Sequence, residues 1–111
     1  MFFQLGCAMI EIIHKKREAV AEHCRRLNVR RLDVFGSAAN GTFDPEKSDI
    51  DFLVEFGEHE HINLFDRYFD LADSLEALFN RKVDLVTAEG AAKKPRFQAN
   101  VEAEKEAVYA L

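Results

Sequence analysis

Apolar residues recur at helical spacing in two long stretches of the chain. Over residues 9–27 they follow a three-to-four-residue repeat with lysine, arginine and glutamate between them, which predicts an amphipathic helix ending near Asn28. A second such pattern covers residues 58–80. A final helix is expected over residues 96–110, after a polar linker over residues 88–95.

Short apolar runs rich in β-branched residues separate these helices. Runs over residues 31–35, 50–56 and 81–87 predict strands, because glycine, proline, asparagine or serine bounds them. Residues 37–41 form a short helix or loop after the first strand. Strands alternating with helices indicate a compact α/β (α+β) domain, with a small mixed sheet of about three or four strands and flanking helices.

The helix expected over residues 58–80 has an apolar arc wider than one core contact requires. Two interpretations stay open: the sheet and the C-terminal helix together cover the arc, or part of it is a surface for a partner protein. The arc consists of two rows, Leu64, Tyr68, Leu71, Leu75 and Leu78, and Ile62, Phe65, Phe69, Ala72 and Phe79.

The chain is long enough for one domain and too short for two. It has 111 residues, of which 48% are apolar and 10 are phenylalanine, so a packed globule is favoured over disorder. We expect a single domain over residues 9–111. Residues 1–8 fit no amphipathic pattern and are interpreted as a loose extension or a misplaced start.

Charge and cysteine content exclude several function classes. The net charge of −5 argues against extensive nucleic-acid binding, which requires many phosphates to be neutralised. No segment approaches the length of a membrane span. Cys7 and Cys24 are too few for a disulfide framework, so we interpret both as reduced thiols in a cytoplasmic protein.

The most informative polar residues lie where the first expected strand ends and the second begins. Gly36 and Ser37 close the first strand, where backbone N–H groups and a hydroxyl can hold phosphate. Eleven residues then precede Asp49, with Asp51 two residues further on. Alternate side chains of a strand share a face, so these carboxylates point the same way and repel each other. A divalent cation relieves that repulsion, and hard oxygen ligands suit Mg²⁺.

A third carboxylate, Asp84, lies in the middle of the apolar strand expected over residues 81–87. A carboxylate inside such a strand is costly unless it is exposed or paired, so a metal or a reacting proton is an expected partner. Simple exposure on an edge strand is the alternative. The three acids form one site only if the second and third strands pair or nearly do so.

Together these residues match the requirements of nucleotidyl transfer. A nucleoside triphosphate would lie with its β- and γ-phosphates against Gly36 and Ser37, while Asp49 and Asp51 hold Mg²⁺. A second Mg²⁺ shared with Asp84 would complete a two-metal clamp on an in-line displacement. Asp84 is also a candidate to receive the proton of the acceptor hydroxyl. No lysine follows the Gly-Ser pair, so a Walker A motif is absent.

The order of these motifs resembles that of the DNA polymerase β-type nucleotidyltransferases. Within that superfamily, the short chain and the run FGSAANGTFDPEKSDIDFLVEF are similar to minimal nucleotidyltransferases (MNT), antitoxins that act beside HEPN-domain ribonuclease toxins. The resemblance implies the polymerase β-type fold and Mg²⁺-dependent transfer of AMP from ATP to a tyrosine of a HEPN partner. It assigns catalysis and metal binding to Asp49, Asp51 and Asp84, and nucleotide binding to Gly36 and Ser37.

Two features depart from the family pattern. Asn40 stands where members often carry an arginine, and the spacer before Asp49 is one residue longer than the commonest form. Lys93, Lys94 or Arg96 could replace the missing charge, although a solvated loop is the plainer interpretation.

Two rival functions stay open. Asn40 and the wide apolar helix favour a non-catalytic module that binds nucleotide or metal and neutralises a partner by direct contact. Transfer of a nucleotide to a small molecule, such as an aminoglycoside, would require an acceptor pocket from a second subunit. The sequence does not decide whether the protein forms homo- or hetero-oligomers.

Overall fold

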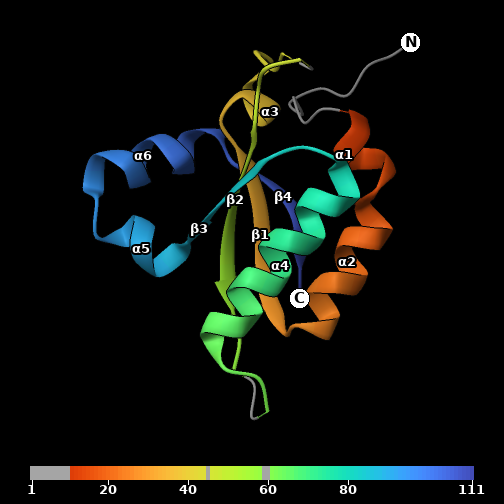
Figure 1. The fold of residues 1–111 in the computed structure, drawn as a ribbon. Coiled ribbons are helices and arrows are strands. Elements are labelled where there is room, and N and C mark those ends of the chain that lie inside the picture. Colours follow the sequence, from red (N-terminus) through yellow and green to blue (C-terminus); the bar gives the residue numbers. More distant parts are fainter. Residues whose placement is uncertain (1–10, 45, 59–60) are drawn as a thin grey trace.

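A mixed sheet with helices on both faces forms the centre of the protein (Figure 1). The computed structural model describes residues 11–44, 46–58 and 61–111. In chain order the elements are α1 (Glu11–Lys15), α2 (Arg17–Arg26), β1 (Val29–Phe35), α3 (Ser37–Asn40), β2 (Ile50–Phe56), α4 (Leu64–Phe79), β3 (Val83–Thr87), α5 (Ala88–Ala92), α6 (Pro95–Glu104) and β4 (Glu106–Ala110).

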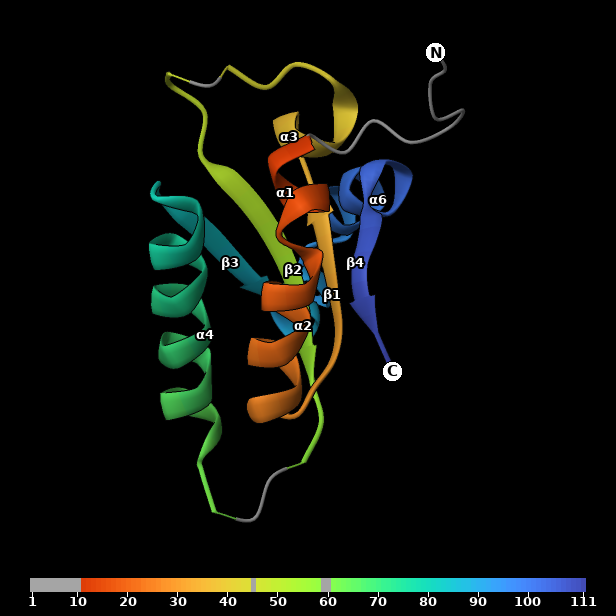
Figure 2. The same cartoon turned by 90° about the vertical axis from the view of Figure 1, so that its right-hand side faces the viewer.

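The four strands lie in the order β3-β2-β1-β4. β1 is antiparallel to both of its neighbours, whereas β2 and β3 are parallel. Helices α2 and α4 lie side by side on one face of the sheet, and α5 and α6 lie on the other (Figures 1 and 2). The predicted fold class, a small mixed sheet with flanking helices, is confirmed.

Side chains of β2 alternate between two apolar clusters, one on each face of the sheet. Ile50, Phe52 and Val54 are buried in the main core beneath α2 and α4. Leu53 points to the other face, where it packs with Phe35 of β1 and with residues of α5 and α6. Because both faces are covered, the central strands read as nearly continuous apolar runs.

The first two predicted helices have different bounds in the structure. The helix expected over residues 9–27 is divided at Lys16, whose Nζ donates to the carbonyl of Leu78 at 2.9 Å. Asn28 adopts a left-handed conformation (φ 54°) just beyond α2, in agreement with the predicted end. Helix α4 begins only at Leu64, because Asn63 caps it by accepting from the N–H of Asp66. The extension predicted over residues 1–8 lies outside the described residues.

The prediction for the C-terminal part of the chain was wrong in two places. The expected polar linker contains α5, which Thr87 caps through a hydrogen bond from the N–H of Gly90. The expected final helix ends at Glu104, and residues 106–110 instead form β4 beside β1. Pairing with β1 and burial of Val108 override the local helical pattern.

The described helices and Cys24 bear on two expectations from the sequence, concerning membrane spans and free thiols. Within them, none of the helices is long and apolar enough to cross a membrane. Cys24 is a free thiol in the core, and burial raises its pKa to about 12. Cys7 lies outside the described residues.

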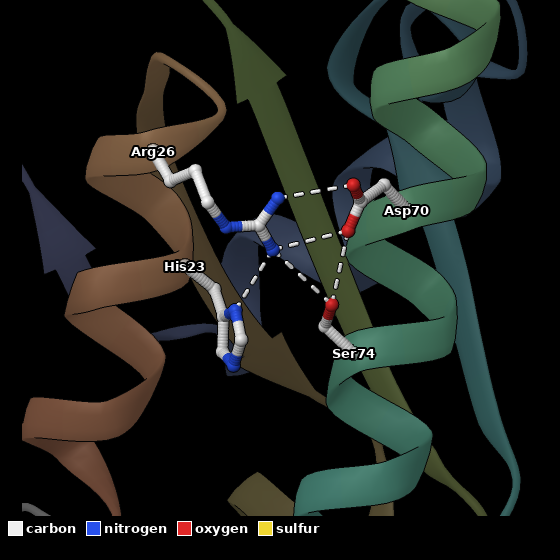
Figure 3. A network of polar contacts seen from close by, with 4 residues as sticks. All are labelled: His23, Arg26, Asp70 and Ser74. Atoms are coloured by element: carbon white, nitrogen blue, oxygen red, sulfur yellow. Dashed lines mark hydrogen bonds and ion pairs between the residues drawn. The ribbon is translucent and has the colours of Figure 1, made fainter.

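A polar network joins α2 to α4 on the surface (Figure 3). Arg26 donates through Nη1 and Nη2 to the two carboxylate oxygens of Asp70, each at 3.0 Å. Its Nη2 also donates to Nδ1 of His23 at 2.9 Å and to Oγ of Ser74 at 3.4 Å. The hydrogen bonds from Arg26 lower the pKa of the Asp70 carboxyl group.

We expect Asp70→Asn to lower the free energy of unfolding by about 0.5–1 kcal/mol at pH 7, because both charged side chains are partly exposed. The pKa of Asp70 is depressed in the folded state, so this stabilisation is present above the unfolded pKa of about 3.9 and is lost as pH falls below it. Urea unfolding at pH 7 and pH 3 measures the difference. Asp73→Asn is the control, since exposed Asp73 forms no salt bridge within the described residues.

Candidate active site

The chain turns sharply where β1 ends and α3 begins. Gly36 has φ 69° and ψ −149°, a backbone conformation that is essentially restricted to glycine. Its carbonyl accepts hydrogen bonds from the N–H groups of Ala39 and Asn40, both at 2.9 Å. Ser37 begins α3, where the first N–H groups of a helix lack intrahelical acceptors. Gly36 and Ser37 therefore present donors at the end of β1.

Asp51 and Asp84 lie side by side on neighbouring strands. β2 and β3 pair in parallel with Asp51 beside Asp84, which confirms the strand pairing that the predicted site requires. Burial raises the pKa of Asp51 to about 6, and Asp84 adds to this through charge repulsion and a hydrogen bond. Asp49 and Glu104 raise the pKa of Asp51 further by repulsion. The Asp51 carboxyl group therefore holds a proton to a higher pH than an isolated one does.

The carboxylate of Asp51 lies directly against the backbone of Gly36. A Cβ atom built on Gly36 would overlap Oδ2 of Asp51 and lie 3.4 Å from its Cγ. The backbone conformation therefore requires glycine at residue 36, and a Cβ atom there would also force the Asp51 carboxylate to move. This contact fixes the turn at the end of β1 relative to the acidic residues of β2.

The other two predicted acids lie around this contact. Asp49 is partly exposed and immediately precedes β2, while Asp84 is exposed on the edge strand β3. Asp84 is thus exposed, as the simpler interpretation expects, and it also lies beside Asp51, while a metal or a reacting proton as its partner stays a prediction. Within the described ranges, no group of three or more His, Cys, Asp or Glu side chains converges tightly enough to hold a metal ion. The structure brings Asp51 and Asp84 together and leaves Asp49 beside them.

Glu104 is a fourth acidic residue near Asp51 that the sequence analysis missed. Its charge helps to raise the pKa of Asp51, and its Oε2 accepts from Nδ2 of Asn40 at 3.3 Å. Asn40, in turn, accepts hydrogen bonds through Oδ1 from the N–H and hydroxyl groups of Thr42. Asn40 therefore connects α3 to the end of α6. No sequence signal placed Glu104 here, because the predicted helix continued past it.

Arg81, just before β3, contacts the loop that leads to Asp49 and was also missed as a site residue. Its Nη1 donates to the carbonyl of Ser48 at 3.2 Å, and its Cζ lies 4.9 Å from the ring centroid of Phe43. Its buried Nε has no hydrogen-bond partner among the described residues. Arg81 thus brings a positive charge to the loop before Asp49. The cations considered from the sequence, Lys93, Lys94 and Arg96, are exposed between α5 and the first turn of α6.

Comparison with known proteins identifies the family. Residues 16–109 match the model of the nucleotidyltransferase domain family. The chain belongs to this family. It is 41% identical over 73 residues to the protein adenylyltransferase MntA of Thermococcus cleftensis, a match that covers 66% of this chain and 65% of that protein. It is 37% identical over 92 residues to a candidate protein adenylyltransferase of Methanocaldococcus jannaschii, covering 83% and 86% of the two chains.

Solved structures of nucleotidyltransferases have the same fold. A candidate minimal nucleotidyltransferase superimposes with a TM-score of 0.71 at 35% identity, covering 88% of this chain and 94% of that chain. An MNT antitoxin in complex with the tri-AMPylated HEPN toxin of Shewanella oneidensis gives a TM-score of 0.62 at 17% identity, covering 89% and 73%. At that identity the second likeness supports the fold alone. The predicted polymerase β-type nucleotidyltransferase fold is confirmed.

Proposed function

We propose that this nucleotidyltransferase transfers AMP from ATP to a tyrosine of a HEPN ribonuclease toxin and acts as the antitoxin of the pair. The observation that carries the proposal is that Asp51 lies against both Asp84 and the Gly36 turn. N–H groups that could donate hydrogen bonds to phosphate are thereby placed next to two adjacent carboxylates. Relatives named as protein adenylyltransferases support the choice of a protein acceptor. A cytoplasmic location stays a prediction from the sequence.

The acidic residues fit Mg²⁺ by their chemistry. Burial, and after it repulsion from Asp84, raises the pKa of Asp51, so the ionised carboxylate costs free energy that a bound cation would offset. Asp49, Asp51 and Asp84 would be oxygen ligands of two ions, with phosphate oxygens and waters as further ligands, so neither ion requires all three carboxylates. When bound, Mg²⁺ supplies charge neutralisation on the triphosphate and lowers the pKa of the acceptor hydroxyl.

The chain's own residues would then bind the phosphates and accept the proton of the acceptor hydroxyl. Gly36 and Ser37 would hold the β- and γ-phosphates through their N–H groups and the hydroxyl. In the transfer, a bond forms between the tyrosine oxygen and the α-phosphorus, and the bond from that phosphorus to the β-phosphate oxygen breaks, releasing pyrophosphate. Asp84 is exposed and can approach the hydroxyl of a bound protein, so it would receive the tyrosine proton.

The decisive experiment follows label from ATP onto protein. The purified chain is incubated with Mg²⁺ and α-phosphate-labelled ATP, with and without the protein encoded beside it in its genome. We expect label on the neighbouring protein with the wild type and none with Asp49→Asn/Asp51→Asn. Unlabelled neighbour protein that still binds the wild-type chain would contradict the proposal.

A second candidate function is a non-catalytic module that neutralises its partner by binding alone. The exposed apolar residues of α4 favour it, since they offer a contact surface away from the carboxylates. Asp49→Asn/Asp51→Asn separates the two candidates. Neutralisation of the partner's ribonuclease activity by a folded double variant supports binding alone, and its loss supports catalysis.

We expect Arg81→Met to lower the rate of AMP transfer by about tenfold, because it removes the bond to Ser48 and the charge near Asp49. Methionine retains an apolar stem for packing on Phe43. Label incorporation at saturating ATP measures the change, with Lys82→Met as the control, since Lys82 is an exposed neighbour. An unchanged rate would show that the loop before Asp49 does not depend on Arg81.

A further inference from the structure

Helix α4 exposes large apolar side chains from both rows of its apolar arc. Leu64, Phe65 and Phe69 are 47%, 69% and 48% exposed, and we call these three side chains the apolar ridge. The centroids of the Phe65 and Phe69 rings lie 4.8 Å apart, so these two rings form one continuous apolar surface. The C-terminal helix cannot cover them, because α6 lies on the opposite face of the sheet (Figure 1). Of the two interpretations of the wide apolar arc, the structure therefore favours a partner surface.

A groove of about 420 Å³ adjoins the ridge. It lies between the first turn of α4, the end of β2 and the start of α5, and Leu64 belongs to both ridge and groove. Tyr68 fixes the position of α4 beside the edge strand, since its hydroxyl donates to the carbonyl of Leu85 in β3. The apolar part of the lining consists of Val54, Phe56, Leu64, Ala88 and Ala92.

The charged groups that line the groove are mainly acidic. Glu55, Glu58 and Glu89 are exposed, and none of them forms a salt bridge within the described residues. Among the described residues, Arg67 is the basic residue that lines the groove. It is buried and donates hydrogen bonds to the carbonyls of Leu27 and Gly57. Its charge is thus directed inward. Glu55 lies opposite Arg31 of β1 and interacts with its charge without a salt bridge, so the rim presents three exposed carboxylates, of which Glu55 is partly offset.

We propose that the ridge and the groove bind an amphipathic helix of a partner protein, whose apolar residues enter the groove and whose lysine or arginine residues face the three glutamates. Burial of the partner's apolar side chains in the groove supplies affinity, and the complementary charges supply orientation and selectivity. A second copy of this chain fits less well, because a two-fold contact of the patch with itself would bring the glutamate rims together.

Docking at this surface leaves the carboxylates accessible. Asp51 is near the start of β2 and Phe56 is its last residue, so the groove lies roughly 16 Å along the strand from the site. A protein bound there can present a hydroxyl to Asp84 from a distance that one small domain spans. The inference rests on the proposed function only where it identifies the docked protein with the acceptor of AMP.

Two synthetic helical peptides of about 18 residues test the surface directly. Both carry a leucine stripe, and one has lysine flanks where the other has glutamate. Fluorescence anisotropy without ATP or Mg²⁺ should show binding of the lysine peptide only. Phe65→Ser/Phe69→Ser should weaken binding about tenfold or more, and circular dichroism checks that this surface variant is folded.

Charge variants test the rim. Glu55→Gln/Glu58→Gln/Glu89→Gln should weaken binding of the lysine peptide and reduce its dependence on salt. The matched control is Glu11→Gln/Glu22→Gln/Glu46→Gln, which removes three exposed carboxylates outside the groove lining and should leave binding unchanged. Equal affinity for both peptides, or equal losses in the two triple variants, would overturn the proposal.

Two further measurements separate this inference from its alternatives. Sedimentation that shows a concentration-dependent dimer, lost in Phe65→Ser/Phe69→Ser, would overturn it in favour of a second copy. Asp49→Asn/Asp51→Asn should bind the lysine peptide as the wild type does. Peptide binding without AMP transfer to any protein would support the docking surface and reject the proposed function. AMP transfer that Phe65→Ser/Phe69→Ser leaves unchanged would support the proposed function and reject the docking surface.

Discussion

Asp51→Asn is expected to lower the rate of AMP transfer by about 10³-fold or more. Asp51 is the carboxylate that contacts both Asp84 and the Gly36 turn, so its loss removes a proposed Mg²⁺ ligand at the point where the phosphates would bind. Electrostatic stabilisation by a bound metal is worth several kcal/mol, and each 1.36 kcal/mol changes a rate about tenfold. Label incorporation under single-turnover conditions measures the loss.

The same substitution should stabilise the protein when Mg²⁺ is absent. The pKa of Asp51 is raised to about 6, so the folded state favours the protonated carboxyl group. The stabilisation that the protonated Asp51 carboxyl group gives the folded state is complete below the unfolded pKa of about 3.9. It is lost as pH rises through 6. Asparagine avoids this loss, and we expect a gain of about 1–2 kcal/mol at pH 7.5 after allowing for solvent screening of the half-buried group.

Urea unfolding in the presence of EDTA measures this gain at pH 7.5 and pH 4. At pH 4 the wild type and Asp51→Asn should have nearly equal free energies of unfolding. Glu22→Gln, an exposed change on α2, serves as the control at both pH values. A variant that is inactive and also less stable at pH 7.5 would show that Asp51 has a structural role and is not a strained, metal-binding residue.

The part of the site that lies on β1, β2 and β3 could be predicted from the sequence. Gly36 and Ser37 end an apolar run, and the run around Asp51 has the observed bounds of β2. Strand periodicity is a local property, so it assigned Asp51 and Asp84 to separate strands but left open whether those strands pair. The structure shows that they pair in parallel, which the crossover through α4 allows.

Residues that reach the site through tertiary contacts could not be predicted. Glu104 lies near Asp51 because the chain leaves α6 at Lys105 and returns as β4 beside β1. The sequence after Glu104 has no turn signal strong enough to predict that change from helix to strand. Arg81 was included in an expected strand, and its contact with Ser48 depends on the path of a loop that no periodicity describes.

Gly36→Ala should impair both folding and catalysis. The conformation of Gly36 is costly for any residue with a Cβ, by about 1–3 kcal/mol, and the new methyl group would also displace Asp51. We therefore expect a loss of about 2–3 kcal/mol in the free energy of unfolding and a rate of AMP transfer lowered about 10²-fold or more. Urea unfolding and label incorporation, at a temperature where the variant is folded, measure the two effects.

Gly41→Ala is the matched control that separates backbone strain from displacement of Asp51. Gly41 also has a positive φ, 88°, but a Cβ built on it meets nothing within 4 Å. Alanine there should cost about 1 kcal/mol of stability and leave AMP transfer nearly unchanged. If both glycine variants lost activity in proportion to their stability, backbone strain alone would explain the effect. If only Gly36→Ala lost activity, the contact between the turn and the Asp51 carboxylate is what aligns the phosphate-binding and acidic halves of the site.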